Sequence, residues 1–214
     1  GLQIHMKGRR KIFFAAFRQL LYFTVMLGFV FFVHFLSYHF RISTFSEYGI
    51  IENIQFGMLV CSGIFFMTEG IYFKNYRELL FLLASFCAVA SCREMDNYFD
   101  KHLPIISWRI GFIFLLAALF LSYLNRHKLT RQLVSFGTSP AFYMMCMAMI
   151  VIIPIAQCVG HRPFVVAVLG ENQVREIKEF IEESCECIGY LLILLSTCEI
   201  YFDILRTKYK SHKL

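Results

Sequence analysis

The chain has 214 residues, of which 58% are hydrophobic and 17% are charged, and its formal net charge is +6. A soluble domain of this length needs more charged residues to cover its surface, so the composition excludes an ordinary soluble protein and predicts a membrane protein. The basic residues flank apolar runs and form no stripe with aromatic residues, which excludes nucleic acid as a partner.

The N-terminal segment predicts an uncleaved first span. Residues 1–5, which precede Met6, are typical of a remnant of an expression vector, and we predict a single transmembrane domain over residues 6–214. A basic stretch followed by an apolar run is similar to the start of a signal peptide. This run is too long for a signal peptide, however, and no small-residue cleavage site follows it.

Six apolar segments in succession predict the fold class. The predicted spans are residues 13–38, 50–70, 79–97, 104–124, 138–158 and 184–205. Each is about as long as a helix that crosses the hydrocarbon core. Pro104 and Pro140 lie near predicted helix starts, where a missing N–H is tolerated, whereas Pro154 predicts a kink inside the fifth span. We therefore predict an all-α, polytopic integral membrane protein with about six transmembrane helices.

The segment before the last span predicts a short amphipathic helix. Val174, Ile177, Phe180 and Ile181 recur at helical spacing, after a break at Gly170. We expect this helix either to lie at the membrane interface or to run straight into the last span.

The distribution of basic residues predicts the orientation. Fourteen of the 21 Lys and Arg residues lie on the side of the predicted spans that contains both termini. The positive-inside rule then places both termini in the cytoplasm. This architecture is typical of small proteins of the bacterial inner membrane, and we predict that location.

Most acidic residues lie at the opposite, outer ends of the predicted spans. Acidic residues contribute little to topology, so their asymmetry needs another cause. Charges at membrane depth are costly and usually functional. The asymmetry therefore predicts an outer site lined by carboxylates and arginines.

The first segment of this predicted site is the end of the third span, Arg93-Glu94-Met95-Asp96, with Asp100 one turn beyond Asp96. In the functional interpretation, Arg93 orients one carboxylate while the others bind a cation or move a proton. The alternative interpretation is a solvated helix end with a structural ion pair.

The second segment is a polar stripe along the second span. Glu52 and Gln55 share a helix face, and Ser62 and Glu69 continue it. Because lipid cannot satisfy polar groups, we expect the stripe to face the interior of the helix bundle. The alternative is that Glu52 is interfacial and Gln55 only bonds a neighbouring helix.

The third segment begins the last span with Glu182, Glu183 and Glu186, and Tyr190 lies one turn deeper. Three acids repel one another unless a metal ion, an arginine or protonation offsets their charge. The alternative is a wet helix start, where acids suit the helix dipole.

Histidine and cysteine residues add candidate ligands. His161 is the one histidine that we expect to take part in chemistry. Cys92, Cys158, Cys185 and Cys187 lie near the outer end, where an oxidising compartment permits a disulfide. The pairs Cys158-x-x-His161 and Cys185-x-Cys187 are candidate metal ligands without a full zinc spacing.

These segments combine into one predicted outer pocket. The predicted ligand- or ion-binding residues are Glu52, Gln55, Arg93, Glu94, Asp96, Asp100, Arg109, His161, Glu183, Glu186 and Tyr190. The candidate cofactor is a divalent metal ion, with candidate ligands Glu52, Glu94, Glu183, Glu186 and His161.

Three classes of function fit this pocket. The first is a protein that binds or transports a cation, a proton or an amphipathic solute. The second is a membrane-embedded enzyme in which the carboxylates either hold a metal ion or act as acid and base on a lipid headgroup. The third is a non-catalytic subunit that docks a partner membrane protein or a second copy of the chain. The first class requires the fewest sequence features, because it needs neither a nucleophile nor a complete set of metal ligands. The sequence contains no phosphate-binding loop, nucleophile elbow or zinc-protease motif.

Overall fold

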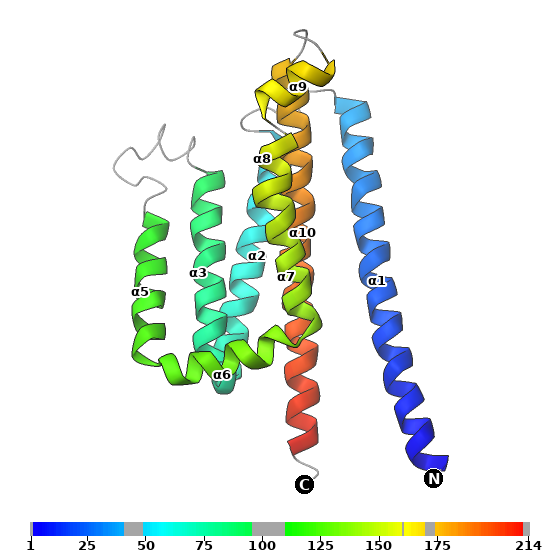
Figure 1. Ribbon diagram of the computed structural model, residues 1–214, viewed down its shortest axis with the longest axis vertical. Helices are drawn as coiled ribbons and strands as arrows, with labels where there is room; N and C mark the ends of the chain where they lie inside the picture. The colour runs from blue at the N-terminus through cyan, green and yellow to red at the C-terminus, as the bar shows by residue number, and fades with distance from the viewer. Residues whose placement is uncertain (1, 41–48, 96–109, 160, 170–173, 212–214) are drawn as a thin grey trace. The chain divides into compact units, whose positions relative to one another are not determined.

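The computed structural model describes residues 2–40, 49–95, 110–159, 161–169 and 174–211, and every regular element among them is helical (Figure 1). This confirms the all-α prediction. The chain divides into two compact units, Gly1–Arg41 and Ile42–Leu214. The first unit is one helix, α1 (Leu2–Phe40), whose segment Phe13–His39 is long and apolar enough to span a membrane.

The second unit is a helical bundle. Its helices are α2 (Ile50–Tyr72), α3 (Arg77–Glu94), α5 (Ile110–Leu124), α6 (Arg126–Gly137), α7 (Pro140–Ile150), α8 (Ala156–Val159), α9 (Arg162–Leu169) and α10 (Val174–Ser211). A short 3-10 turn, η2 (Lys74–Tyr76), joins α2 to α3, so these two helices pack side by side with opposite directions. On its other face α3 packs against α5, and α10 packs against both α2 and α7.

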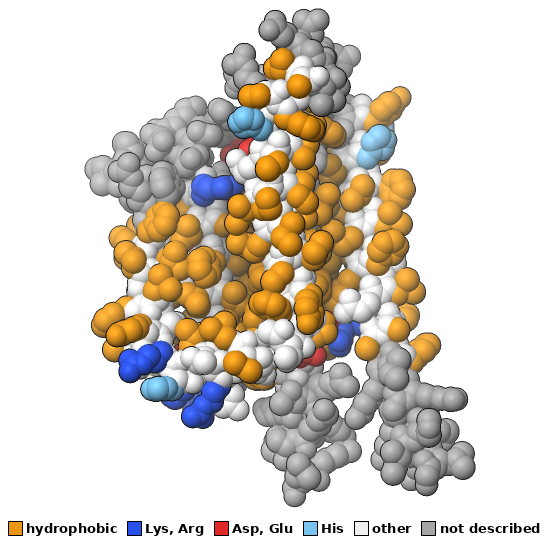
Figure 2. Space-filling view, viewed as in Figure 1, with side chains coloured by type: hydrophobic (Ala, Val, Ile, Leu, Met, Phe, Trp, Pro, Cys, Tyr) orange, Lys and Arg blue, Asp and Glu red, His pale blue; other side chains and the backbone are white. Residues whose placement is uncertain are grey.

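Four segments are long and apolar enough to cross a membrane: Phe13–His39, Ile50–Tyr72, Pro140–Val159 and Ile177–Leu205. A fifth is added if α5 and α6, which meet at a bend of 101°, count as one broken span. Exposed hydrophobic side chains cover the flanks of the helices (Figure 2), as expected for a surface that faces lipid. The structure therefore supports a membrane protein with four or five such segments among its described residues.

The third and fourth predicted spans correspond to α3 and α5. Helix α3 carries charged pairs at both ends, Arg77 with Glu78 and Arg93 with Glu94, which shorten its apolar stretch. Helix α5 begins at Ile110, and residues 104–109 lie outside the described residues. The count of six spans thus stays a prediction.

The stretch before the last span does not form a separate short helix among the described residues. Helix α10 runs without a break from Val174 to Ser211. No glycine or proline interrupts the sequence between Val174 and Gly189, so nothing ends the helix there. The stretch that was predicted to be amphipathic is therefore continuous with the last apolar segment, and its place at the membrane interface stays a prediction.

The fifth predicted span accommodates its internal proline in a wide turn. Pro154 lies in a π-helical turn, η3 (Val151–Ile155), that joins α7 to α8. Proline lacks the N–H of a normal helical turn, and a π turn relieves the clash of its ring with the preceding turn. Ser139 caps the start of α7 by accepting a hydrogen bond from the backbone N–H of Phe142, at 3.3 Å, with Pro140 at the first helical position.

Helix α6 was not expected from the apolar runs, which left residues 125–137 as a connection. It is amphipathic, and it buries Gln132 and Phe136 against the bundle. The amide of Gln132 is the reason for this docking. Its Nε2 donates to Glu78 Oε2 at 2.7 Å, and its Oε1 accepts from the backbone N–H of Leu79 at 2.9 Å. Both partners belong to the first turn of α3, whose N–H groups have no helical partner.

The first testable prediction concerns the close packing of α3 and α5. A Cβ atom on Gly111 of α5 would lie 2.9 Å from the Cα atom of Val89 in α3. Because backbone atoms cannot move aside as side chains do, Gly111→Ala must separate the two helices. We expect it to destabilise the protein by about 1–3 kcal/mol. Thermal unfolding in detergent, followed with a thiol-reactive dye that reports exposure of the buried thiols of Cys87 and Cys187, measures the change.

The matched control for this substitution is Gly57→Ala in α2, where a Cβ atom would meet nothing within 4 Å. Alanine favours a helix over glycine, so this variant should unfold at the same or a higher temperature. Equal unfolding temperatures for the two variants would contradict the packing argument.

Candidate functional site

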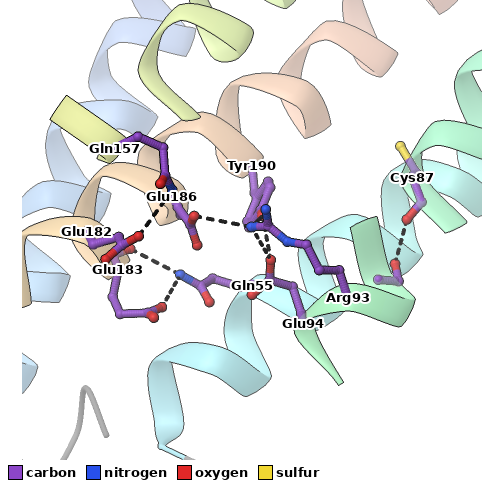
Figure 3. A network of polar contacts seen from close by, with 10 residues as sticks. Gln55, Cys87, Arg93, Glu94, Gln157, Glu182, Glu183, Glu186 and Tyr190 are labelled. Carbon is purple, nitrogen blue, oxygen red and sulfur yellow. Dashed lines mark hydrogen bonds and ion pairs between the residues drawn. The ribbon is translucent and has the colours of Figure 1, made fainter. Parts of the chain in front are cut away.

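Three helices of the bundle meet in one polar network (Figure 3). Arg93, at the end of α3, donates from Nη2 to Glu94 Oε1 at 3.1 Å and to Glu186 Oε1 of α10 at 3.2 Å. The same atom lies 3.5 Å from the hydroxyl oxygen of Tyr190. The Tyr190 hydroxyl donates to Glu94 Oε1 at 2.6 Å. One guanidinium therefore links two carboxylates and a phenol from α3 and α10.

Helix α2 joins the network through Gln55, which is completely buried. Its Nε2 donates to the carboxylate of Glu183, at 2.8 Å, and to the backbone carbonyl of the same residue, at 3.1 Å. The Oε1 atom of Gln55 is buried and has no hydrogen-bond partner within the part of the chain that the structure describes. An unpaired buried oxygen is costly, so this atom is available to accept from a bound group.

The charges of the network do not balance among the described residues that form it. The carboxylates of Glu94 and Glu186 both contact Arg93, while that of Glu183 contacts the neutral amide of Gln55. Glu94 and Glu186 are buried, whereas the side chain of Arg93 is 52% exposed. Two buried carboxylates therefore share one guanidinium, and a third carboxylate nearby is bound by a neutral amide. Attraction and repulsion between such partly buried groups are stronger than at a fully exposed surface.

A separate set of contacts involves Glu182, which lies on α10 one turn before Glu186. Glu182 accepts from Gln157 Nε2 at 3.1 Å and pairs with Lys178, four residues before it, at 3.3 Å. Lys178 and Gln157 were absent from the predicted site. Gln157 is a single polar residue near the end of an apolar run, which is a weak signal in a sequence. Glu182 thus has its own partners, distinct from those of Glu186.

Six predicted site residues are brought together by the fold: Gln55, Arg93, Glu94, Glu183, Glu186 and Tyr190. Glu52 lies on α2 one turn before Gln55 and is half-buried. His161 is exposed in the turn before α9, where its backbone N–H donates to the carbonyl of Cys158. The three other predicted residues, Asp96, Asp100 and Arg109, lie outside the described residues.

The polar stripe of α2 faces the interior, as predicted. Gln55, Ser62 and Glu69 are all buried. The Ser62 hydroxyl donates to the carbonyl of Met58 in its own helix, and Glu69 Oε2 is buried without a hydrogen-bond partner among the described residues. Glu69 is therefore a second position, away from Arg93, where the bundle holds an acid in its interior.

The predicted metal centre is not formed by the described residues. No group of three His, Cys, Asp or Glu side chains among them is placed to hold a metal ion, so Glu52, Glu94, Glu183, Glu186 and His161 do not converge as ligands. Two of these candidate ligands, Glu94 and Glu186, are instead paired with the guanidinium of Arg93, at 3.1 and 3.2 Å.

The suggested disulfide is also absent from the structure. All eight cysteines belong to the described residues, and all are free thiols, including Cys92, Cys158, Cys185 and Cys187. Proximity to one end of the bundle is not sufficient for a disulfide, because the two Cβ atoms must also approach within about 4.5 Å.

Comparisons with known proteins do not assign this chain to a family. No family model matches it, and neither a curated protein nor a solved structure is significantly similar to it. The polar network is therefore the basis on which a function is inferred.

The second testable prediction concerns the coupling of Arg93 to Glu186. Arg93→Gln leaves two buried carboxylates without their cation, and we expect a destabilisation of about 1–3 kcal/mol. Once Arg93 is absent, Glu186→Gln should cost little or should partly restore stability, because it removes a charge that is already unpaired. A double-mutant cycle measured by thermal unfolding should therefore give a coupling energy above about 0.5 kcal/mol.

The control for this cycle is Lys178→Gln, which removes a cation from a pair whose carboxylate, that of Glu182, is more exposed than that of Glu186. Such pairs contribute less than about 1 kcal/mol, so this variant should be nearly neutral. Additive effects of Arg93→Gln and Glu186→Gln would show that the two side chains do not form a shared site.

Proposed function

We propose that this chain is a small polytopic membrane protein whose carboxylate network binds a proton or a small cation and passes it into the membrane. The observation that carries the proposal is the meeting of Glu94 and Glu186 at the single guanidinium of Arg93, with Glu183, three residues before Glu186 on α10, bound by the neutral amide of Gln55. The positive-inside count places this network at the outer face of a bacterial inner membrane, with both termini in the cytoplasm.

The proposal follows from the cost of unbalanced charge in a region of low dielectric constant. Two carboxylates that contact one guanidinium leave one negative charge in excess, and Glu183 adds another. A buried charge without a partner is strongly unfavourable, so the network gains free energy when a cation binds or when a carboxyl takes up a proton. The unpaired Oε1 atom of Gln55 supplies an additional acceptor for such a guest.

A buried polar path along α2 and α10 supports transport over simple binding. Below Gln55, α2 buries Ser62 and Glu69, and α10 buries Thr197 and Glu199. These two helices pack against each other. The rise from Gln55 to Glu69 is about 21 Å, which is a large part of the thickness of the hydrocarbon core. Acids and hydroxyls inside a membrane bundle are typical of proton and ion pathways.

The observed convergence favours this proposal over the docking subunit. A docking surface requires the acidic side chains to point outward and apart, whereas Glu94 and Glu186 share one partner and are buried. No contact among the described residues specifically supports the alternative of an enzyme that acts on lipid headgroups, which stays a hypothesis.

The third testable prediction is a cation- or proton-specific gain in stability. The purified protein is unfolded thermally in choline chloride and in lithium, sodium, potassium, magnesium and calcium chlorides at one ionic strength, and across a range of pH. A ligand at one hundred times its dissociation constant stabilises by about 2.7 kcal/mol. We expect one cation, or acid pH, to raise the unfolding temperature, and the joint substitution Glu183→Gln with Glu186→Gln to abolish the increase.

The matched control is Glu182→Gln, which removes an acid from the same helix but leaves both contacts of Arg93 in place. This variant should keep most of the increase. If the wild-type protein unfolds at the same temperature in every salt and at every pH, the network does not bind a proton or any of these cations.

The fourth testable prediction separates transport from binding. Wild-type protein in liposomes should move protons or the identified cation down an imposed gradient, measured with an ion-sensitive dye inside the vesicles. Glu69→Gln should reduce this flux by at least tenfold, because it removes one of the two buried acids of the path, while the stability increase at the Arg93 network persists. A flux no greater than that of empty liposomes would contradict transport and would indicate a protein that only binds the proton or cation.

A further inference from the structure

A basic pocket lies at the opposite end of the bundle from the Arg93 network. It has a volume of about 530 Å³ and forms where the turn between α2 and α3 meets α6. Its lining residues are Lys74, Asn75, Tyr76, Lys128, Arg131, Gln132 and Ser135. Figure 2 shows Lys and Arg side chains gathered over the part of the molecule that α6 occupies. From Glu78 to Glu94, α3 rises by about 24 Å, so the two sites are well separated.

One face of α6 builds this pocket. Lys128, Arg131, Gln132 and Ser135 follow the spacing of three and four residues that places side chains on a common helix face. The Gln132 amide holds this face against the first turn of α3. The Ser135 hydroxyl lies 3.3 Å from that of Tyr76, and both residues line the pocket. The pocket is therefore part of a fixed contact between helices.

The lining has the chemistry of a site for a phosphate group. Lys74, Lys128 and Arg131 supply three positive charges, and none of the described residues that line the pocket is acidic. The nearby carboxylate of Glu78 is buried and is already bound by Gln132 and by Arg77, the latter at 3.6 Å. Arginine and lysine side chains bind phosphate oxygens with charge-assisted hydrogen bonds, and hydroxyl groups add further donors.

A neighbouring pocket of about 360 Å³ extends the site into the bundle. Tyr76 and Ser135 line both pockets, so the two are adjacent. The second pocket has a mixed lining, with apolar side chains such as Leu80, Phe136 and Ile204 and polar ones that include Ser139 and Asp203. The basic side chains of the site therefore lie in the first pocket, which is where we expect the phosphate group to bind.

We propose that the pocket between α6 and the α2–α3 turn binds a phosphate-bearing group, as carried by an anionic phospholipid or by a soluble phosphate compound. The orientation predicted from the sequence places this pocket at the cytoplasmic face, where basic pockets between membrane helices bind acidic headgroups. This site shares no residue with the Arg93 network and does not depend on the function proposed for it.

Two arms test the proposal with the full-length protein in detergent. In the lipid arm, native mass spectrometry measures the affinity for phosphatidylglycerol and for phosphatidylcholine with the same acyl chains. In the soluble arm, inorganic phosphate replaces chloride at constant ionic strength during thermal unfolding. We expect phosphatidylglycerol to bind more tightly than phosphatidylcholine. Lys128→Gln and Arg131→Gln should each weaken that binding about fivefold, since one basic side chain near an anionic surface contributes about 1 kcal/mol.

Arg126→Gln is the matched control, because Arg126 is exposed on the same helix and lies over the ring of Tyr123 instead of lining the pocket. It removes the same charge and should change lipid affinity less than twofold. A phosphate-specific increase in unfolding temperature that Arg131→Gln abolishes, without a lipid preference, would assign the site to a soluble phosphate compound. Equal effects of Lys128→Gln, Arg131→Gln and Arg126→Gln in both arms would overturn the proposal.

Discussion

The contact of Arg93 with Glu94, Glu186 and Tyr190 is the constraint on which the arrangement of the bundle depends. Inside hydrocarbon no water can satisfy a polar side chain, so each buried group must find its partner within the protein. Arg93 meets this requirement for carboxylates of two helices at once. A single side chain therefore joins α3 to α10 at this end of the bundle.

The same requirement organises the other end of the bundle with a different pair of groups. The first turn of α3 exposes backbone N–H groups and buries the carboxylate of Glu78, and the Gln132 amide satisfies both. This contact holds α6 across the bundle and directs its basic face toward the α2–α3 turn. The Arg93 network thus carries more acidic than basic side chains, and the pocket beside α6 carries basic ones. The two proposed sites follow from this separation of charge.

Much of the architecture was predictable because it depends on local properties of the chain. Apolar runs located the segments that became α1, α2, α7 and α10, and helical spacing placed Ser62 and Glu69 on the buried face of α2. Helix α6 was missed because its apolar residues are too few for a span. Its position is stabilised by the hydrogen bond from Gln132 to Glu78, 54 residues earlier in the chain. A single contact between distant residues produces no periodic pattern in the sequence.

The sequence by itself determined that the protein is helical and suited to a membrane, and that acids gather near the ends of its helices, because hydropathy and helical period are properties of neighbouring residues. Only the tertiary structure decided which charges meet. Adjacent residues such as Arg93 and Glu94 normally diverge on a helix, and Glu186 lies 93 positions from Arg93. Packing of α2, α3 and α10 brought these groups together, paired two of the expected metal ligands with a guanidinium, and left the cysteines unpaired.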